Sequence, residues 1–578
     1  MKHWILLLLA SLPLTSQADL WQTPSAGDVQ ASSSGPLTLQ ADTGLLLQLL
    51  EQAPDYQAGL AGSELQLPLA NGQLTTVAVY RHALLAPAVA AQHPQIRNFR
   101  LVGIDQPAIR GSLTLTARGL HGLLLTPDGS VLINPAEVQS SAMASHYRII
   151  DGTSTPGRAA FHCSVTGHGI TAPAGDEQPT AARPLQAKTF GGQLKTYRLA
   201  VAATQPYSQA VAAGNVNDTL AAIVVAVDRV NTVFERDLGI SLQLVSGSNL
   251  VSTDAGDFSS DNLELMIQQN QAWIDSKLGS ANYDVGHLFS SFPAGSGGGL
   301  AAVASVCDGT RKAQAITGLS ADALQSDMFY IEYVAHEIGH QFGATHTFNA
   351  EGSDAGSGFC NGARQPHNAF PSASAYEPGS GSTIMSYAGL CKEQNLQSSS
   401  DHYFHAASIE QVRRFVDGEV TGTSQCGSSL ATGETPPLAD AGVNVVIPAS
   451  TPFLLQGNAT GVASPSYSWE QYDLGNATDS LAAMHTDAGS GPLVRSRLPA
   501  SEPVRSIPAL ADILANSQSI GERLPTTDRY MNFLFTVRSG LHSIAQDSIS
   551  LQVDKDSGPF VVSAPAAGVI NASTAAGV

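Results

Sequence analysis

One segment of eleven residues, 336–346, constrains the fold of this 578-residue chain more than any other part of its sequence. It reads HEIGHQFGATH, so His336 and His340 lie four positions apart. On a helix, this spacing places both imidazoles on the same face, one turn apart. Gly343 allows a sharp turn with a positive φ, after which the chain can swing His346 back toward the same point. The segment therefore predicts a helix and a turn that gather three imidazoles.

These three imidazoles have the composition of a catalytic zinc site. Three neutral histidine nitrogens leave the fourth position of a Zn2+ ion open for water, whereas four protein ligands close a structural zinc site. Glu337 directly follows the first histidine, where its carboxylate can reach such a water and act as general base. The sequence therefore predicts Zn2+ as the cofactor, with His336, His340 and His346 as its ligands.

A second motif, STIMSY at 382–387, follows the histidines along the chain. An eleven-residue histidine pattern followed by a methionine turn is the metzincin signature. Residues 194–426 therefore resemble a metzincin catalytic domain of the reprolysin-like, secreted bacterial type. The likeness extends to the sequence NTVFE at 231–235 and to the strand that follows Gly239. It implies an α/β domain, with a twisted mixed sheet and an active-site helix, that acts as an endopeptidase on polypeptides.

The resemblance also implies roles for residues outside the histidine motif. Met385 would pack beneath the zinc without binding it. Tyr387 matches a tyrosine near the metal that could donate a hydrogen bond to the developing oxyanion. An edge strand above the cleft would pair with the substrate backbone, and its expected residues are Gly299, Leu300, Ala301 and Ala302. Reprolysins usually carry Asp directly after the third histidine, whereas this chain has Thr347, which leaves the subfamily open.

Four of the five cysteines fall within this region, an even number that suits two disulfides in an oxidising compartment. The sequence allows three pairings, and the reprolysin layout implies Cys360 with Cys391 and Cys307 with Cys426. Cys163 is left over in the preceding domain. Its thiolate could occupy the open zinc position and keep a precursor latent. The alternative is a buried, inert cysteine, and residues 161–165 lack the Arg-Cys-Gly pattern of the matrix metalloprotease switch.

The N-terminal 18 residues have the pattern of a signal peptide. Lys2 and His3 precede an apolar run at 4–12, and a small-residue site ends at Ala18. We expect cleavage after Ala18 and a secreted protein, with association to the cell surface left open. No later segment approaches ~18 uninterrupted apolar residues, so no transmembrane helix is expected.

Composition and turn residues indicate that the chain is a multidomain protein and predict where its domains begin and end. Short alternating segments at 19–190 predict a mostly β prodomain, which we expect to inhibit the enzyme within the same chain and to end in an exposed linker at 171–188. The catalytic domain is expected at 191–430, and a Pro-rich linker at 431–440. Residues 441–556 predict an all-β sandwich that resembles PKD-type, immunoglobulin-like modules. Residues 557–578 form a tail or begin a further β module.

Within the catalytic domain, periodicity predicts alternating strands and helices. The expected strands are 197–203, 240–245, 284–289 and 300–306. The expected helices are 216–234, 263–278, 327–342 and 406–415. Asn217 or Asp218 is the expected cap of the first of these helices, and Gly239 its end.

Charge and the remaining residues narrow the function further. Lys plus Arg total 28 against 48 Asp plus Glu, and this net charge of −20 argues against a nucleic-acid partner. A monomer is expected. The carboxylates of Asp440, Asp473 and Asp547 could include a calcium site, because calcium takes oxygen ligands from loops. Three other histidines are expected to be packing or surface residues: His287, His402 and His405.

Two alternative functions remain at this stage. The first is a secreted adhesin or binding protein with a vestigial zinc site, which the intact histidines and Glu337 disfavour. The second keeps the zinc and acts as an amidase on cell-wall peptides.

Overall fold

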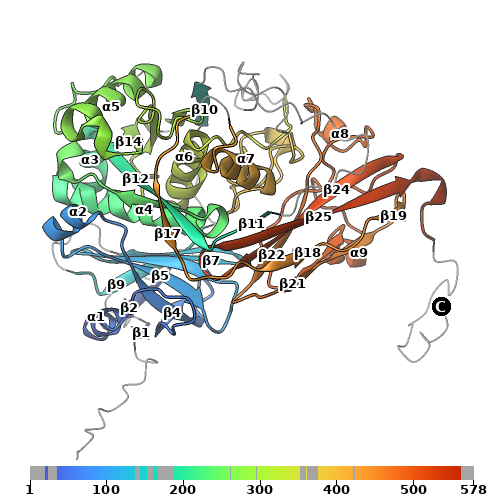
Figure 1. The fold of residues 1–578 in the computed structure, drawn as a ribbon, viewed down its shortest axis with the longest axis horizontal. Coiled ribbons are helices and arrows are strands. Elements are labelled where there is room, and N and C mark those ends of the chain that lie inside the picture. The colour runs from blue at the N-terminus through green and yellow to red at the C-terminus, as the bar shows by residue number, and fades with distance from the viewer. Residues whose placement is uncertain are drawn as a thin grey trace, which may run out of the picture.

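Three packed regions make up the protein in a computed structural model (Figure 1). It describes residues 20–23, 36–136, 143–152, 188–260, 262–294, 296–351, 360, 375–420 and 423–561, together with the backbone of 160–166. The predicted signal peptide at 1–18, most of the predicted linker at 171–188 and residues 562–578 lie outside the described residues. Residues 559–561, at the start of the predicted tail or further β module, have no regular secondary structure.

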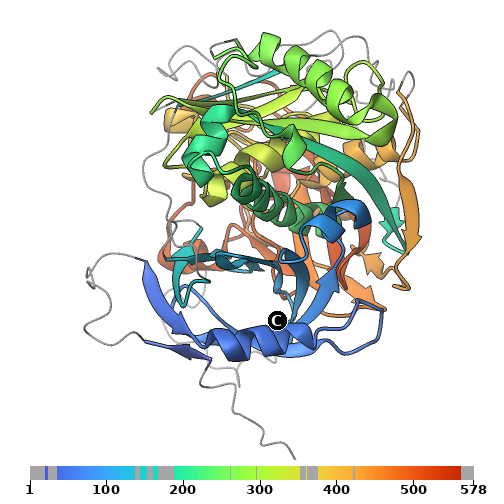
Figure 2. The same cartoon turned by 90° about the vertical axis from the view of Figure 1, so that its left-hand side faces the viewer.

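The N-terminal region is an antiparallel sheet of nine strands in the order β1-β2-β9-β8-β7-β6-β5-β4-β3. Its short alternating segments and turn residues explain this meander, as at the Pro127-Asp128 turn between β7 and β8. Helix α1 covers one face and the long helix α4 of the next region covers the other (Figure 2). The strands are β1 (Trp21–Gln22), β2 (Leu37–Ala41), β3 (Ser63–Pro68), β4 (Leu74–His82), β5 (Arg97–Gly103), β6 (Arg110–Thr116), β7 (Gly119–Thr126), β8 (Gly129–Pro135) and β9 (His146–Asp151), and the helices are α1 (Thr43–Glu51) and α2 (Pro87–Gln92).

The central region is a mixed sheet in the order β10-β15-β16-β14-β12-β13, with β17 beside β12. The strands β12, β13, β14 and β16 run parallel, and β15 runs antiparallel to β16. Their bounds are β10 (Ala160–Thr166), β12 (Gln193–Ala203), β13 (Ile240–Leu244), β14 (Val285–Phe292), β15 (Ser296–Ala302), β16 (Ala315–Ser320) and β17 (Ser428–Ala431). Strand β16 was not predicted, because it follows a run of polar residues and turns at 307–314.

Helices α3 (Gln205–Ala212), α4 (Val216–Leu238), α5 (Leu263–Leu278) and α7 (Ala406–Val416) surround this sheet. The expected cap of α4 is wrong. Asn215 caps the helix, because its side chain accepts from the backbone N–H groups of residues 217 and 218 at 3.0 and 3.1 Å. Gly239 ends α4 with a φ of 62°, as predicted. No single helix among the described residues is long and apolar enough to span a membrane, although α3 and α4, bent by 88°, pass the same criterion as a pair.

The C-terminal region contains a sheet in the order β11-β25-β24-β22, with β19 beside β25, and two smaller sheets. Trp469 is buried on β22 and stacks on Phe535 with 4.7 Å between ring centroids. β11 precedes the central region in sequence yet pairs with β25. The elements are β11 (Lys188–Phe190), β18 (Leu438–Asp440), β19 (Val445–Pro448), β20 (Phe453–Gln456), β21 (Asn458–Thr460), β22 (Ser466–Gln471), α8 (Leu481–Met484), β23 (Val504–Ile507), α9 (Leu510–Ala515), β24 (Arg529–Ser539) and β25 (Ser543–Asp554).

Buried polar contacts join the three regions. Arg100 of the N-terminal sheet donates to Glu235 of α4 at 2.6 Å and also pairs with Asp228. Arg538 of β24 donates to Asp237 of α4 at 2.8 Å. Helix α4 therefore lies against both flanking regions.

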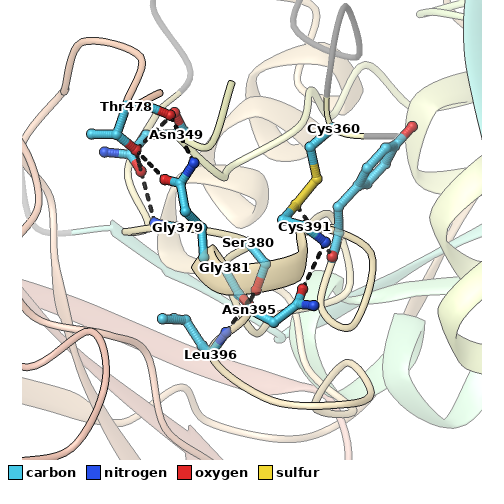
Figure 3. The surroundings of a disulfide bond; sticks show 11 residues. Asn349, Cys360, Gly379, Ser380, Gly381, Cys391, Asn395, Leu396 and Thr478 are labelled. Atoms are coloured by element: carbon cyan, nitrogen blue, oxygen red, sulfur yellow. Dashed lines mark hydrogen bonds between the residues drawn. A yellow bond between two sulfur atoms is a disulfide. The ribbon is translucent and has the colours of Figure 1, made fainter. Parts of the chain in front are cut away.

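Two disulfides lie within the central region. They join Cys307 to Cys426, with Cα atoms 5.6 Å apart, and Cys360 to Cys391, with Cα atoms 5.4 Å apart. The second is surrounded by hydrogen-bonded loop residues, including Asn395, which accepts from the Cys391 N–H at 2.7 Å (Figure 3).

Candidate metal centre

The three predicted histidines converge at one buried point. A π-helical stretch (Met328–Ala335) runs into α6 (His336–Gln341), which carries the first two of them. Gly343 follows with a φ of 92°, and this turn returns His346 to the helix. The three Nε2 atoms are 3.0 Å apart for His336 and His340, 3.1 Å for His340 and His346, and 3.2 Å for His336 and His346.

These distances fit a tetrahedral zinc ion. With Zn–N bonds of ~2.0–2.1 Å, two ligand nitrogens lie roughly 3.3–3.4 Å apart, close to the observed values. Among the residues that the structure describes, these histidines are the one group of three possible ligands that converges in this way. The donor set therefore fits Zn2+.

Hydrogen bonds fix how two of the imidazoles face this point. His336 Nδ1 lies 2.7 Å from the carbonyl oxygen of Ile384, and His340 Nδ1 lies 2.7 Å from that of Ala344. A carbonyl oxygen accepts only, so each Nδ1 carries the proton and each Nε2 directs a lone pair to the centre. Burial lowers the pKa of His336 to about 4, although the bond to the Ile384 carbonyl raises it slightly, and this keeps the ring neutral near pH 7. Converging lone pairs repel one another, and a bound cation relieves that repulsion.

Glu337 lies beside strand β15 of the central sheet. Its side chain is fully buried. A Cβ atom built on Gly299 of β15 would stand 2.0 Å from Glu337 Oε1, so glycine is needed for this close approach. The carboxylate therefore lies directly against the backbone of β15.

Met385 and Tyr387 line the centre from the methionine turn. A Cβ on Gly339, between the two helical histidines, would meet Met385 Sδ at 2.8 Å, so the thioether packs against this turn of α6. The Tyr387 ring lies 4.8 Å from the His346 ring and 6.2 Å from the His336 ring, measured between centroids. Tyr387 is also 2% exposed, so its ring is buried beside the imidazoles.

The outer edge of β15 is paired with a strand from the segment that precedes the central region. β10 runs parallel to β15, with Cys163 in register with Gly299 and Ser164 with Leu300. The structure describes only the backbone here, so the side chain of Cys163 lies outside the described residues.

The three histidines that were expected to be packing or surface residues lie outside the group of three converging ligands. His287 is buried between Gln341 and Thr317, His402 pairs with Asp327, and His405 accepts from the N–H of residue 407 at the start of α7. The carboxylates proposed for calcium accept from backbone N–H groups instead, and they belong to Asp440, Asp473 and Asp547. Among the described residues, no cluster of three acidic groups occurs.

The sequence did not indicate one residue that contacts both the loop carrying His346 and the methionine turn. Glu377 is fully buried and accepts from Thr347 Oγ1 at 2.6 Å. The hint in the sequence was Thr347 itself, which replaces the acidic residue usual after the third histidine. Nothing local indicated that the carboxylate comes from 30 residues further on.

Comparison with known proteins supports this assignment for part of the chain. Residues 193–414 match the family model described as Metallo-peptidase family M12B Reprolysin-like. This match supports a metzincin-like zinc metallopeptidase. None of the curated proteins matches the chain.

A solved structure described as "Structure of a chaperone-substrate complex" matches at 12% identity and a TM-score of 0.20. The match covers 38% of this chain and 34% of that one, so this chain spans about a third of that structure's length. Similarity at this level carries no argument about fold or function.

Proposed function

We propose that this protein is a secreted zinc endopeptidase that is synthesised as a latent precursor. The observation that carries the proposal is the convergence of three Nε2 atoms within 3.0–3.2 Å of one another, beside the buried carboxylate of Glu337. The reprolysin-like match over residues 193–414 supports the same chemistry.

His336, His340 and His346 would hold the ion. When bound, Zn2+ supplies Lewis acidity, which lowers the pKa of water to ~7 and polarises a peptide carbonyl. Glu337 takes the proton from the attacking water and later gives it to the leaving amine as general acid. The phenol of Tyr387 donates a hydrogen bond to the oxyanion that develops on the scissile carbonyl. No covalent intermediate with the protein is needed.

Strand β15, which becomes an edge strand once β10 is removed, favours an extended polypeptide as substrate. Gly299 brings the β15 backbone against Glu337, so a peptide paired with this strand would have its backbone close to the general base. Main-chain pairing along the strand can hold an extended peptide on both sides of the scissile bond, as cleavage at internal peptide bonds requires.

Latency is supported by the strand that already occupies this edge. β10 pairs with β15 over seven residues, and a strand edge offers one set of N–H and C=O groups. A substrate therefore has to displace β10 before it can pair with β15. Cys163 is in register with Gly299, the residue that contacts Glu337, and this register suits a thiolate in the fourth zinc position.

The latency proposal is tested by Cys163→Ser in the unprocessed precursor. We expect the variant precursor to cleave a fluorogenic peptide faster than the wild-type precursor. After proteolytic removal of the N-terminal region, the two processed enzymes are expected to have equal activity. Equal latency in both precursors would rule out a role for the thiol and leave strand pairing as the sole block.

Secretion is supported by the sequence at 1–18 and by the two disulfides, which persist in oxidising compartments. N-terminal sequencing of the exported protein, before removal of the N-terminal region, is expected to begin at Asp19. A chain that keeps its first residues and stays in the cytoplasm would contradict secretion.

The peptidase activity is tested by Glu337→Ala in the processed enzyme, with Glu351→Ala as the control, because Glu351 lies outside the metal centre. We expect one zinc per chain in all three proteins, and casein cleavage by the wild type and by the control only. Zinc without casein cleavage in the wild type would favour a binding protein, and release of cell-wall peptides alone would favour an amidase.

A further inference from the structure

Glu377 lies between the loop that carries His346 and the methionine turn. Its side chain is fully buried. Its backbone N–H donates to the carbonyl oxygen of Thr347 at 2.8 Å, and the N–H of Tyr376 donates to the same oxygen at 2.8 Å. The residue is therefore fixed against the third-ligand loop by its main chain.

The carboxylate of Glu377 joins this loop to the methionine turn. Oε2 accepts from Thr347 Oγ1 at 2.6 Å and from Thr383 Oγ1 at 2.6 Å. Oε1 accepts from the backbone N–H of Ser382 at 2.9 Å. A buried carboxylate is costly unless hydrogen bonds compensate its charge, and these three donors provide that compensation.

Both segments that the carboxylate joins orient metal ligands. Thr347 directly follows His346, and its N–H donates to the carbonyl oxygen of Met385 at 3.1 Å. Thr383 precedes Ile384, whose carbonyl oxygen accepts from His336 Nδ1 at 2.7 Å. One side chain therefore fixes the backbone beside two of the three histidines.

We propose that Glu377 is a positioning residue, which holds His336 and His346 in their metal-binding orientation through Thr347 and the 382–384 turn. It supplies from a separate loop the carboxylate that reprolysin-like enzymes usually carry directly after the third histidine. The loss of such an outer partner typically costs 10–100-fold in metal affinity. This inference rests on the proposed zinc site.

The test measures zinc affinity in the full chain by chelator competition and the visible spectrum of the cobalt-substituted protein. The variant is Glu377→Gln, which keeps the volume but replaces one carboxylate oxygen by an NH2 group, so that either the two threonine hydroxyls at Oε2 or the Ser382 N–H at Oε1 lose their acceptor. Glu470→Gln is the matched control, because Glu470 is also fully buried but bonds the backbone N–H of Ala406 instead of the metal loops. We expect about 10–100-fold weaker zinc binding and an altered cobalt spectrum for Glu377→Gln alone.

Thr347→Val keeps the inference testable if Glu377→Gln fails to fold, because it removes one donor at constant shape. We expect a smaller loss of zinc affinity in the same direction. Wild-type zinc affinity and an unchanged cobalt spectrum in the variants that fold would overturn the role of Glu377. Absence of zinc binding by the wild type would instead overturn the proposed function.

Discussion

Replacing Arg100 by alanine is expected to loosen the N-terminal sheet from helix α4. The Arg100 side chain is 4% exposed and donates through Nε and Nη2 to Glu235 at 2.6 and 3.1 Å. It also pairs with Asp228, which accepts from Thr114 Oγ1 at 2.7 Å. The variant leaves two buried carboxylates without their cation.

The expected loss can be estimated in two ways. Breaking a buried ion pair by removing one partner costs about 3–5 kcal/mol. Burial alone would raise the pKa of Glu235, but the charge of Arg100, helped by His82, lowers it from 4.5 to about 2. A shift of this size corresponds to about 3 kcal/mol of stabilisation above pH 4.5, which agrees with the first figure.

The assay is denaturant unfolding of the full chain at several pH values. In the wild type, the Glu235 contribution is present above pH 4.5 and is lost as the pH falls toward 2. Without Arg100, burial raises the pKa of Glu235, so protonation in acid relieves the variant. The difference in unfolding free energy is therefore expected to be largest near pH 7 and to shrink on acidification.

Arg97→Ala on the same strand is the control, because Arg97 forms a 3.8 Å pair with Glu51 in which both side chains are more than a third exposed. We expect it to change stability by less than about 1 kcal/mol. Equal effects of the two variants, or a difference that grows as the pH falls, would refute the reasoning.

Three further outcomes follow from the described geometry. Gly299→Ala places a Cβ atom 2.0 Å from Glu337 Oε1, so we expect roughly 100-fold lower kcat/KM with unchanged zinc content, measured on the processed enzyme; full activity would show that the close approach is not needed. Tyr387→Phe is expected to lower kcat about 100-fold with little change in KM, and an equal kcat would remove the phenol from the mechanism. Burial, with the charge of Arg100, lowers the pKa of His82 from 6.5 to about 4, so the wild type is expected to lose stability as the pH falls from 6.5 to 4. In thermal unfolding, His82→Gln is expected to flatten this dependence of stability on pH. An unchanged dependence would exclude His82 as its source.

Local patterns predicted the elements that carry the site. The 3.6-residue period gave helix α5 with its observed bounds, and the His336–His340 spacing with Gly343 gave the helix and turn of the metal centre. These features depend on residues close in sequence, whose relative positions the backbone geometry dictates. The π-helical start of the active-site helix was not predicted, because its apolar spacing is also compatible with an ordinary α-helix.

Contacts between distant segments could not be predicted in the same way. Strand β11 pairs with β25 across more than 350 residues, and Arg100 meets Glu235 across two regions. Glu377 joins two loops only once the chain has folded. A carboxylate in a loop sequence carries no mark of its future partners, so such contacts require the tertiary structure.

Zinc K-edge absorption spectroscopy of the processed enzyme tests the central claim most directly. The account predicts one zinc per chain with three histidine nitrogens at ~2.0–2.1 Å and one light-atom ligand, and loss of this shell in His340→Ala. The unprocessed precursor is expected to add one sulfur at ~2.3 Å if Cys163 binds the ion. A processed wild type without zinc, or with a zinc shell that survives His340→Ala, would contradict the account.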